Sequence, residues 1–187
     1  MDTFRWIATV FSMILGLGVA RLLASAVAVF RARRRAHLDW VPLVWAVFIF
    51  FQQLAFWWSM EELAAMAAHW SFTSFLMLVG LVLALFLAAA LVLPPSEIAE
   101  GDDLRDYFET DGRWSLLAVA VFNGLAIVVN HVYWGTALLS PATLLNLALG
   151  VLPLVVFAGS RRVQIIGTAL YVPFGLYTAA QLLPTSY

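Results

Sequence analysis

Six long apolar segments constrain this chain more than any other feature of its sequence. A helix needs about 20 mostly apolar residues to cross the ~30 Å hydrocarbon layer of a bilayer. Six segments approach or meet this length, and they leave short connections and one longer loop between them. We predict membrane spans at residues 6–30, 40–60, 72–93, 114–134, 142–158 and 163–183.

Composition leads to the same fold class. Of the 187 residues, 64% are apolar and 11% are charged, whereas about a quarter of a soluble domain is charged. So little polar material cannot cover a core, and lipid must therefore solvate much of the surface. The length suits one compact bundle. The sequence predicts an all-α, polytopic membrane protein in which residues 1–187 form a single transmembrane domain of six helices.

Several chemistries are excluded or weakened at this stage. The chain contains no cysteine, which excludes disulfides, thiolate nucleophiles and cysteine-ligated metals or iron–sulfur clusters. No Gly-x-Ser-x-Gly motif is present, which weakens a serine hydrolase assignment. We expect the first apolar segment to be a retained span and not a cleaved signal peptide, because its run exceeds the usual ~7–15 residues and its arginines follow the run. We predict no cofactor and no metal site.

The distribution of arginine sets the orientation of the chain. All ten basic residues are arginine, and eight of them lie in or beside the first, third and fifth loops. The second and fourth loops hold none. Because positive residues stay cytoplasmic, we expect both termini outside. These eight residues are Arg31, Arg33, Arg34, Arg35, Arg105, Arg113, Arg161 and Arg162.

A resemblance supports a bacterial setting. The stretch from Gly16 to Leu23 reads Gly-Leu-Gly-Val-Ala-Arg-Leu-Leu, Gln53 precedes a Phe-Trp-Trp run, and the third segment ends at Leu93 and Pro94. These features resemble a group of bacterial six-helix membrane proteins without an assigned function. The resemblance covers about the first two thirds of the chain. It implies a multi-pass protein of the bacterial inner (plasma) membrane and implies no activity.

The longest loop, residues 94–113, is acidic and faces the cytoplasm in this topology. It holds seven acidic residues against Arg105 and Arg113. Either Asp102 or Asp103 would cap a short helix here. Leu104, Tyr107 and Phe108 then share one face, and we expect an amphipathic helix lying on the membrane with its apolar face down.

The acidic side of the same short helix raises the question of a cation site. Asp102, Asp106 and Glu109 fall on a common side. No calcium-loop pattern is present, so we interpret these residues as a solvated acidic face. A protein partner is a second use for the loop.

Polar residues at membrane depth are the most informative part of the sequence. Measured between its end aromatics, the first segment has its midpoint near Gly18, so Arg21 is expected close to the bilayer centre. An arginine there costs about 2.5 kcal/mol or more on insertion scales. Gln52, Gln53 and Asn123 fall near the same depth on other segments. We therefore predict a candidate ligand-binding cluster of Arg21, Gln52, Gln53 and Asn123.

A second polar layer is expected nearer the outer face. It consists of Glu61 and Glu62 at the end of the second segment and of Asn130 and His131 near the end of the fourth. Asn123 and Asn130 lie seven residues apart and so share a helix face. Two prolines, Pro153 and Pro173, are expected to kink the last two helices.

Three functions remain open from sequence. The first is binding or translocation of a small polar or anionic solute, or of a lipid headgroup, at the cluster around Arg21. The second is a non-catalytic membrane subunit or scaffold in which the same cluster only locks helices together. The third is a membrane enzyme that uses Glu61, Glu62 or His131. The expected partners are membrane lipids, a protein at loop 94–113 and a second copy of the chain; nucleic acid is not expected.

Overall fold

The computed structural model describes residues 3–63, 71–95, 99 and 101–182. Within them the chain is helical, with seven α-helices, one π-helical turn (η2) and no β-strand. One isolated bridge links two loops. The elements are α1 (Thr3–Ala32), α2 (Trp40–Leu63), α3 (Phe72–Leu91), α4 (Leu104–Tyr107), η2 (Phe108–Gly112), α5 (Trp114–Trp134), α6 (Pro141–Ala158) and α7 (Arg161–Leu182).

Six of these helices are long and apolar enough to cross a membrane, and the chain is a multi-pass membrane protein by this criterion. This confirms the all-helical prediction and the six apolar segments. Five boundaries differ by one to three residues: the first span continues to Ala32, the third ends at Leu91, the fifth begins at Pro141, and the last runs from Arg161 to Ala180. The six spans are Trp6–Ala32, Trp40–Met60, Phe72–Leu91, Trp114–Trp134, Pro141–Ala158 and Arg161–Ala180.

Short sequence signals define several helix ends. Ser71 caps α3 by accepting a hydrogen bond from the Ser74 amide, and Ser140 caps α6 in the same way. Pro141 follows at the first position of α6, where its missing N–H costs nothing. Helix α5 ends at Gly135, whose φ of 61° is a left-handed conformation that glycine adopts without strain. Helices α6 and α7 continue through their internal prolines.

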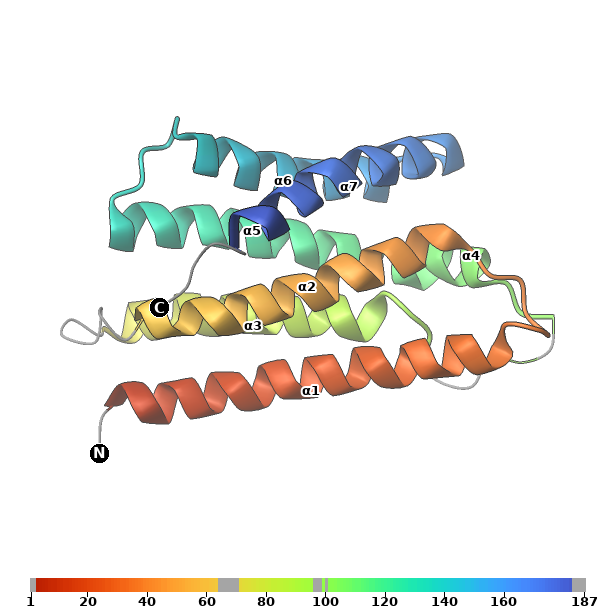
Figure 1. The fold of residues 1–187 in the computed structure, drawn as a ribbon, viewed down its shortest axis with the longest axis horizontal. Helices are drawn as coiled ribbons and strands as arrows, with labels where there is room; N and C mark the ends of the chain where they lie inside the picture. The colour runs from red at the N-terminus through yellow and green to blue at the C-terminus, as the bar shows by residue number, and fades with distance from the viewer. Residues whose placement is uncertain (1–2, 64–70, 96–98, 100, 183–187) are drawn as a thin grey trace.

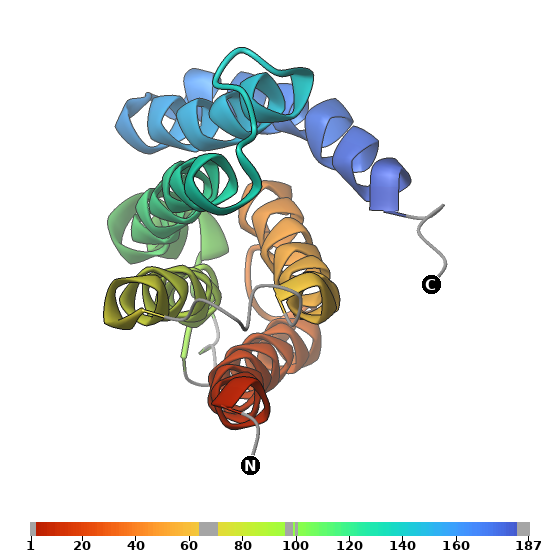
Figure 2. The ribbon, with the colours of Figure 1, turned by 90° about the vertical axis from the view of Figure 1, so that its left-hand side faces the viewer.

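The helices form a bundle whose long axis runs across Figure 1. In the end-on view of Figure 2, α6 and α7 lie on one side, α1 lies on the opposite side, and α2, α3 and α5 lie between them. Helix α5 packs against α3 and α6, and α2 packs against α1, α3 and α7. Helix α7 crosses obliquely over α5 and α6. The beginning of α1 and the end of α7 lie away from the end where α4 sits.

Helix α1 packs closely against α2 because of one glycine. The side chain of Gln53 on α2 is fully buried, and its Nε2 donates to the Leu85 carbonyl of α3 at 3.4 Å. A Cβ atom added at Gly18 of α1 would lie 2.4 Å from this Nε2. Gly18 therefore makes room for an amide that joins α2 to α3.

We predict that Gly18→Ala destabilises the bundle by about 1–3 kcal/mol, because the added methyl group overpacks a filled site. The measurement is the thermal unfolding midpoint of the purified protein in detergent. Gly16→Ala is the matched control, since a Cβ there meets nothing within 4 Å. Equal midpoints for the two variants would contradict the packing described above.

The residues that follow α3 fill the space beyond its end. At the arginine-rich end, α1 and α2 extend farther than α3 does, and α4 and η2 lie past the last turn of α3 (Figure 1). Leu104 and Phe108 are 2% and 0% exposed, within the main apolar core. Tyr107 donates its hydroxyl proton to the carbonyls of Leu91, at 2.9 Å, and Leu93, at 3.2 Å.

The expectation that this apolar face lies on lipid is therefore wrong. Leu104 and Phe108 pack against protein, because α3 is too short to cover the ends of α1 and α2 itself. Burial, reinforced by the nearby carboxylate of Asp111, raises the pKa of Tyr107, and the positive charge of Arg21 opposes this shift. The phenol therefore stays protonated and remains a donor to the two carbonyls.

Backbone hydrogen bonds join the first and third loops at the same end. His37 N donates to the Asp102 carbonyl, and Leu104 N donates back to the His37 carbonyl, both at 3.0 Å. The Gly101 amide donates to the Arg35 carbonyl at 2.9 Å. The α1–α2 connection therefore lies fixed against the acidic loop.

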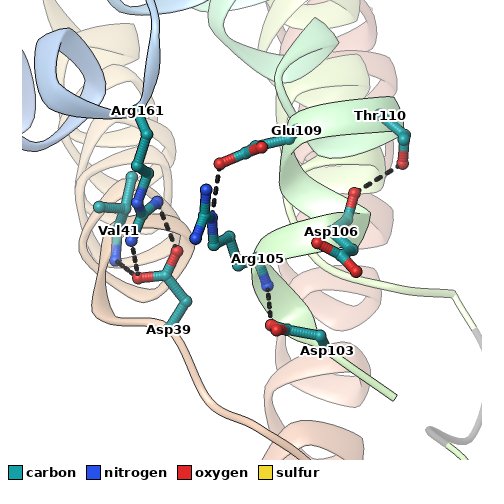
Figure 3. Close-up of polar contacts among 8 residues, drawn as sticks. All are labelled: Asp39, Val41, Asp103, Arg105, Asp106, Glu109, Thr110 and Arg161. Atoms are coloured by element: carbon teal, nitrogen blue, oxygen red, sulfur yellow. Dashed lines mark hydrogen bonds and ion pairs between the residues drawn. The ribbon is translucent and has the colours of Figure 1, made fainter.

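An ion pair joins the first loop to the start of α7. Figure 3 shows the Arg161 guanidinium facing the Asp39 carboxylate, with both nitrogen–oxygen contacts at 2.7 Å. Asp39 also accepts from the Val41 amide at 3.2 Å, so it caps α2. The Asp39 side chain is only 6% exposed. Sequence analysis assigned Arg161 to topology alone and did not identify Asp39.

We predict that Asp39→Asn and Arg161→Gln are coupled by roughly 0.5–3 kcal/mol in a double-mutant cycle of unfolding, because a partly buried pair loses more than an exposed one when one partner is removed. The Arg105–Glu109 pair in Figure 3 is the control, with side chains 46% and 33% exposed. An exposed i,i+4 pair is worth about 0.3–0.5 kcal/mol. A larger coupling for the control pair would contradict the assigned role of Asp39.

Candidate functional site

A cavity of about 480 Å³ lies between α2, α5, α6 and α7. Helix α3 contributes to its wall as well. The cavity lies where α2 and α5 approach each other, and there the two helices meet through an edge-on contact of Phe56 with Phe122, at 6.0 Å between ring centres. The lining residues used below are Phe48, Phe51, Gln52, Phe56, Ser59, Phe122, Asn123, Ala126, Asn130, Trp134, Thr136, Asn146, Tyr171, Gly175 and Thr178.

Four amide side chains from three helices converge on this cavity. Gln52 comes from α2, Asn123 and Asn130 from α5, and Asn146 from α6. The seven-residue spacing of the two asparagines on α5 places them on one helix face, as their sequence positions indicate. Packing alone does not require four amides at one place in an apolar bundle. The hydrogen bonds that these amides make indicate how much of their capacity remains for a bound molecule.

The hydrogen-bonding capacity of these amides is only partly used by the described residues. Gln52 Nε2 lies 3.4 Å from the Tyr171 hydroxyl, and Gln52 Oε1 is buried with no partner among them. Asn123 Nδ2 donates to the Val119 carbonyl one turn earlier, at 2.9 Å. The described residues give the side chains of Asn130 and Asn146 no hydrogen bond. A buried amide oxygen without a donor costs about 1–3 kcal/mol, so a polar molecule in the cavity would be favoured.

Aromatic rings form much of the remaining wall. Phe48, Phe51, Phe56, Phe122 and Trp134 all line the cavity, and so does the ring of Tyr171. No lining residue carries a formal charge. The site therefore offers amide and hydroxyl groups beside flat apolar faces, which suits an uncharged molecule with both polar and apolar edges.

The cavity occupies one half of the bundle. Its α2 and α5 residues run from the middle of each helix to the end away from the arginine-rich loops, and its α6 and α7 residues lie in the same half. Toward the arginine-rich end, the Trp45 ring lies tilted against the Tyr171 ring, with 4.4 Å between ring centres, and its indole N–H donates to the Thr168 hydroxyl at 3.0 Å. Apolar side chains fill the space beyond this contact.

The predicted cluster around Arg21 is not one site in the structure. Gln52 and Asn123 line the cavity, but Arg21 and Gln53 do not. Arg21 Nη1 donates to the Pro95 carbonyl past the end of α3, at 3.1 Å, and Gln53 is buried at the α1–α3 side of α2. Neighbours on a helix point about 100° apart, which separates Gln52 from Gln53.

The depth assigned to Arg21 from sequence depended on a centred first span. Helix α1 extends past the end of α3 (Figure 1), so the midpoint of α1 is not level with the midpoint of α3. The guanidinium reaches the level where α3 ends.

The residues of the predicted outer polar layer also lie in different places. Asn130 lines the cavity, while His131 is exposed with its Nδ1 2.9 Å from the Thr136 carbonyl. Glu61 and Glu62 lie in the last turn of α2, and their side chains are outside the part of the chain that the structure describes. Within the described part, no group of acidic and histidine residues has the arrangement of a metal site.

Sequence analysis missed the contribution of α7. Thr168, Tyr171, Gly175 and Thr178 follow one another at spacings of three, four and three residues, which places them on one face of α7. Three of them line the cavity, and Thr168 lies just beneath it. A small and polar stripe of this kind is typical of a helix face turned into a membrane bundle, and it was the available signal.

Comparison with known proteins assigns no family. A scan of protein-family models, a search of curated proteins and a search of solved structures each gave no significant match.

We predict that the cavity contains water. The chain has no cysteine, so one introduced thiol reports its own surroundings. Ala126→Cys in the cavity wall should react with a charged methanethiosulfonate reagent, because such reagents attack thiolates in water. Val128→Cys is the control two residues along α5, at an exposed apolar position outside the cavity. Equal, slow labelling of both variants in lipid nanodiscs would show a dry, closed interior.

Proposed function

We propose that this chain is a bacterial inner-membrane protein that binds or translocates a small, uncharged, polar solute in the cavity. The observation that carries the proposal is the convergence of four amide side chains on the cavity, one of which, Gln52, has a buried Oε1 with no partner among the described residues. In a membrane a polar group of this kind needs a partner inside the protein or its cavities.

The proposed orientation places both termini on the outer side of the membrane. Its support is the position of the arginine-rich loops at one end of the bundle, together with the preference of positive residues for the cytoplasm. In this orientation the cavity lies in the outer half, and the Trp45–Tyr171 contact lies on its cytoplasmic side.

The nature of the solute follows from the lining residues. Amides both donate and accept hydrogen bonds. The hydroxyls of Ser59 and Thr178 donate to carbonyls of their own helices and can accept from a solute, and the Tyr171 hydroxyl, which accepts from Gln52, can donate. The lining holds no charge to neutralise an ion. A volume of about 480 Å³ falls within the roughly 300–1,000 Å³ of small-molecule sites. Sugars, polyols and small amides fit this description.

A scaffold role is the second candidate, and Gln53 is the observation that favours it. Its fully buried amide joins α2 to α3 and faces no solute. The two roles are compatible within one bundle, because Gln53 and the cavity amides lie in different places.

The proposal is tested by a thermal-shift screen of sugars, polyols and small amides against the purified protein. A solute at 100 times its Kd should add about 2.7 kcal/mol of stability, which corresponds to roughly 5–10 °C for a chain of this size. Asn130→Leu should abolish the shift, because it removes an amide from the cavity wall. Val128→Leu, on the outer face of α5, should preserve it.

A scaffold would give a different result. No compound would then stabilise the wild-type protein, and Asn130→Leu would raise the unfolding midpoint, because a leucine would fill an empty site without a polar group to satisfy.

A further inference from the structure

Arg21 does not line the cavity, and its charge lies within an apolar membrane span. It lies within an apolar span, one turn from Leu17, which is 63% exposed, and two residues from Leu23, which is 49% exposed. Arg21 itself is partly exposed on the surface of the bundle. A guanidinium among lipid-facing leucines is stable only where its head reaches the membrane interface.

The structure shows where that head lies. Arg21 Nη1 donates to the Pro95 carbonyl, four residues past the last residue of α3. Helix α3 has 20 residues, which at 1.5 Å per residue is about the ~30 Å thickness of the hydrocarbon layer. We take the end of α3 as the edge of the hydrocarbon on this side, which brings the Arg21 head, bonded to the Pro95 carbonyl, to the level of the lipid phosphates.

The surrounding chemistry leaves part of the guanidinium available. Arginine has five N–H donors, and the described residues accept one hydrogen bond from Arg21 and form no ion pair with it. The nearby Tyr107 hydroxyl donates to backbone carbonyls and so is not an anion. Arg31 and Arg33 to Arg35 lie farther along the same end of α1, where the acidic loop lies against the α1–α2 connection and offsets their charge.

We propose that Arg21 binds the phosphate of a phospholipid in the leaflet at the arginine-rich end, on the lipid-facing side of α1 and beside the end of α3. The planar guanidinium matches two phosphate oxygens, and the leucines beside it contact the acyl chains. This site is separate from the cavity and does not depend on the solute proposed for it.

The experiment titrates the purified protein in detergent micelles with phosphatidic acid and with diacylglycerol of the same acyl chains, and native mass spectrometry counts the bound lipid. The two lipids differ only in the phosphate. Arg21→Gln should weaken phosphatidic acid binding roughly tenfold, because charge-assisted hydrogen bonds are lost. Diacylglycerol binding should not change. Arg34→Gln removes the same charge from an exposed position and should change either affinity by less than about twofold.

Arg21→Lys keeps the charge and the position but loses the two-pronged geometry, so phosphatidic acid affinity should fall between those of the wild type and Arg21→Gln. This variant decides the question if the glutamine variant fails to fold. Wild-type affinity in either Arg21 variant would overturn the proposal. Displacement of phosphatidic acid from the wild-type protein by millimolar inorganic phosphate would overturn it too, since the ligand would then be a soluble anion.

Discussion

The hydrocarbon core of a bilayer offers no water to buried amides and hydroxyls, so every polar group in the apolar bundle must find its partner within the protein or in its cavities. Some buried polar groups meet this constraint directly. Gln53 is bonded to the Leu85 carbonyl, and Trp45 is bonded to Thr168. The cavity amides meet it only in part, because Gln52 Oε1 has no partner among the described residues. Gln53 Oε1 likewise has no partner among the described residues, so the two glutamines differ in their place in the bundle: Gln52 lines the cavity, and Gln53 packs between α1 and α3.

The two halves of the bundle are built differently. At the arginine-rich end, α4 and η2 fill the space past α3, the Asp39–Arg161 pair joins the start of α2 to α7, and the tilted contact of Trp45 with Tyr171 closes the interior. At the other end, α7 runs obliquely to the other helices (Figure 1), and three of its residues line the cavity. Gly175 allows the ring of Phe48 to approach α7 closely, since an added Cβ there would lie 2.2 Å from it. One tightly packed half and one half with a cavity are consistent with a protein that receives a solute from one side.

The sequence alone predicts the helices, but it does not predict how each helix is rotated about its own axis in the bundle. Hydrophobicity and length predict the six apolar helices, and the spacing of Asn123 and Asn130 predicts that they share a face. The separation of Gln52 from Gln53 depends on how α2 is rotated against α1 and α7, which no local pattern encodes. The level of Arg21 depends on where α3 ends relative to α1. The Asp39–Arg161 pair joins residues far apart in the chain, so only the packed bundle brings them together.

The central claim is that the cavity amides serve a bound polar molecule rather than one another. An experimental structure in lipid nanodiscs, read at Gln52, Asn123, Asn130 and Asn146, tests it most directly. The claim predicts ordered water or solute density within hydrogen-bonding distance of Gln52 Oε1 and of at least one asparagine. A collapsed interior in which these four side chains bond only to each other and to backbone carbonyls would contradict it, and the bundle would then be a scaffold.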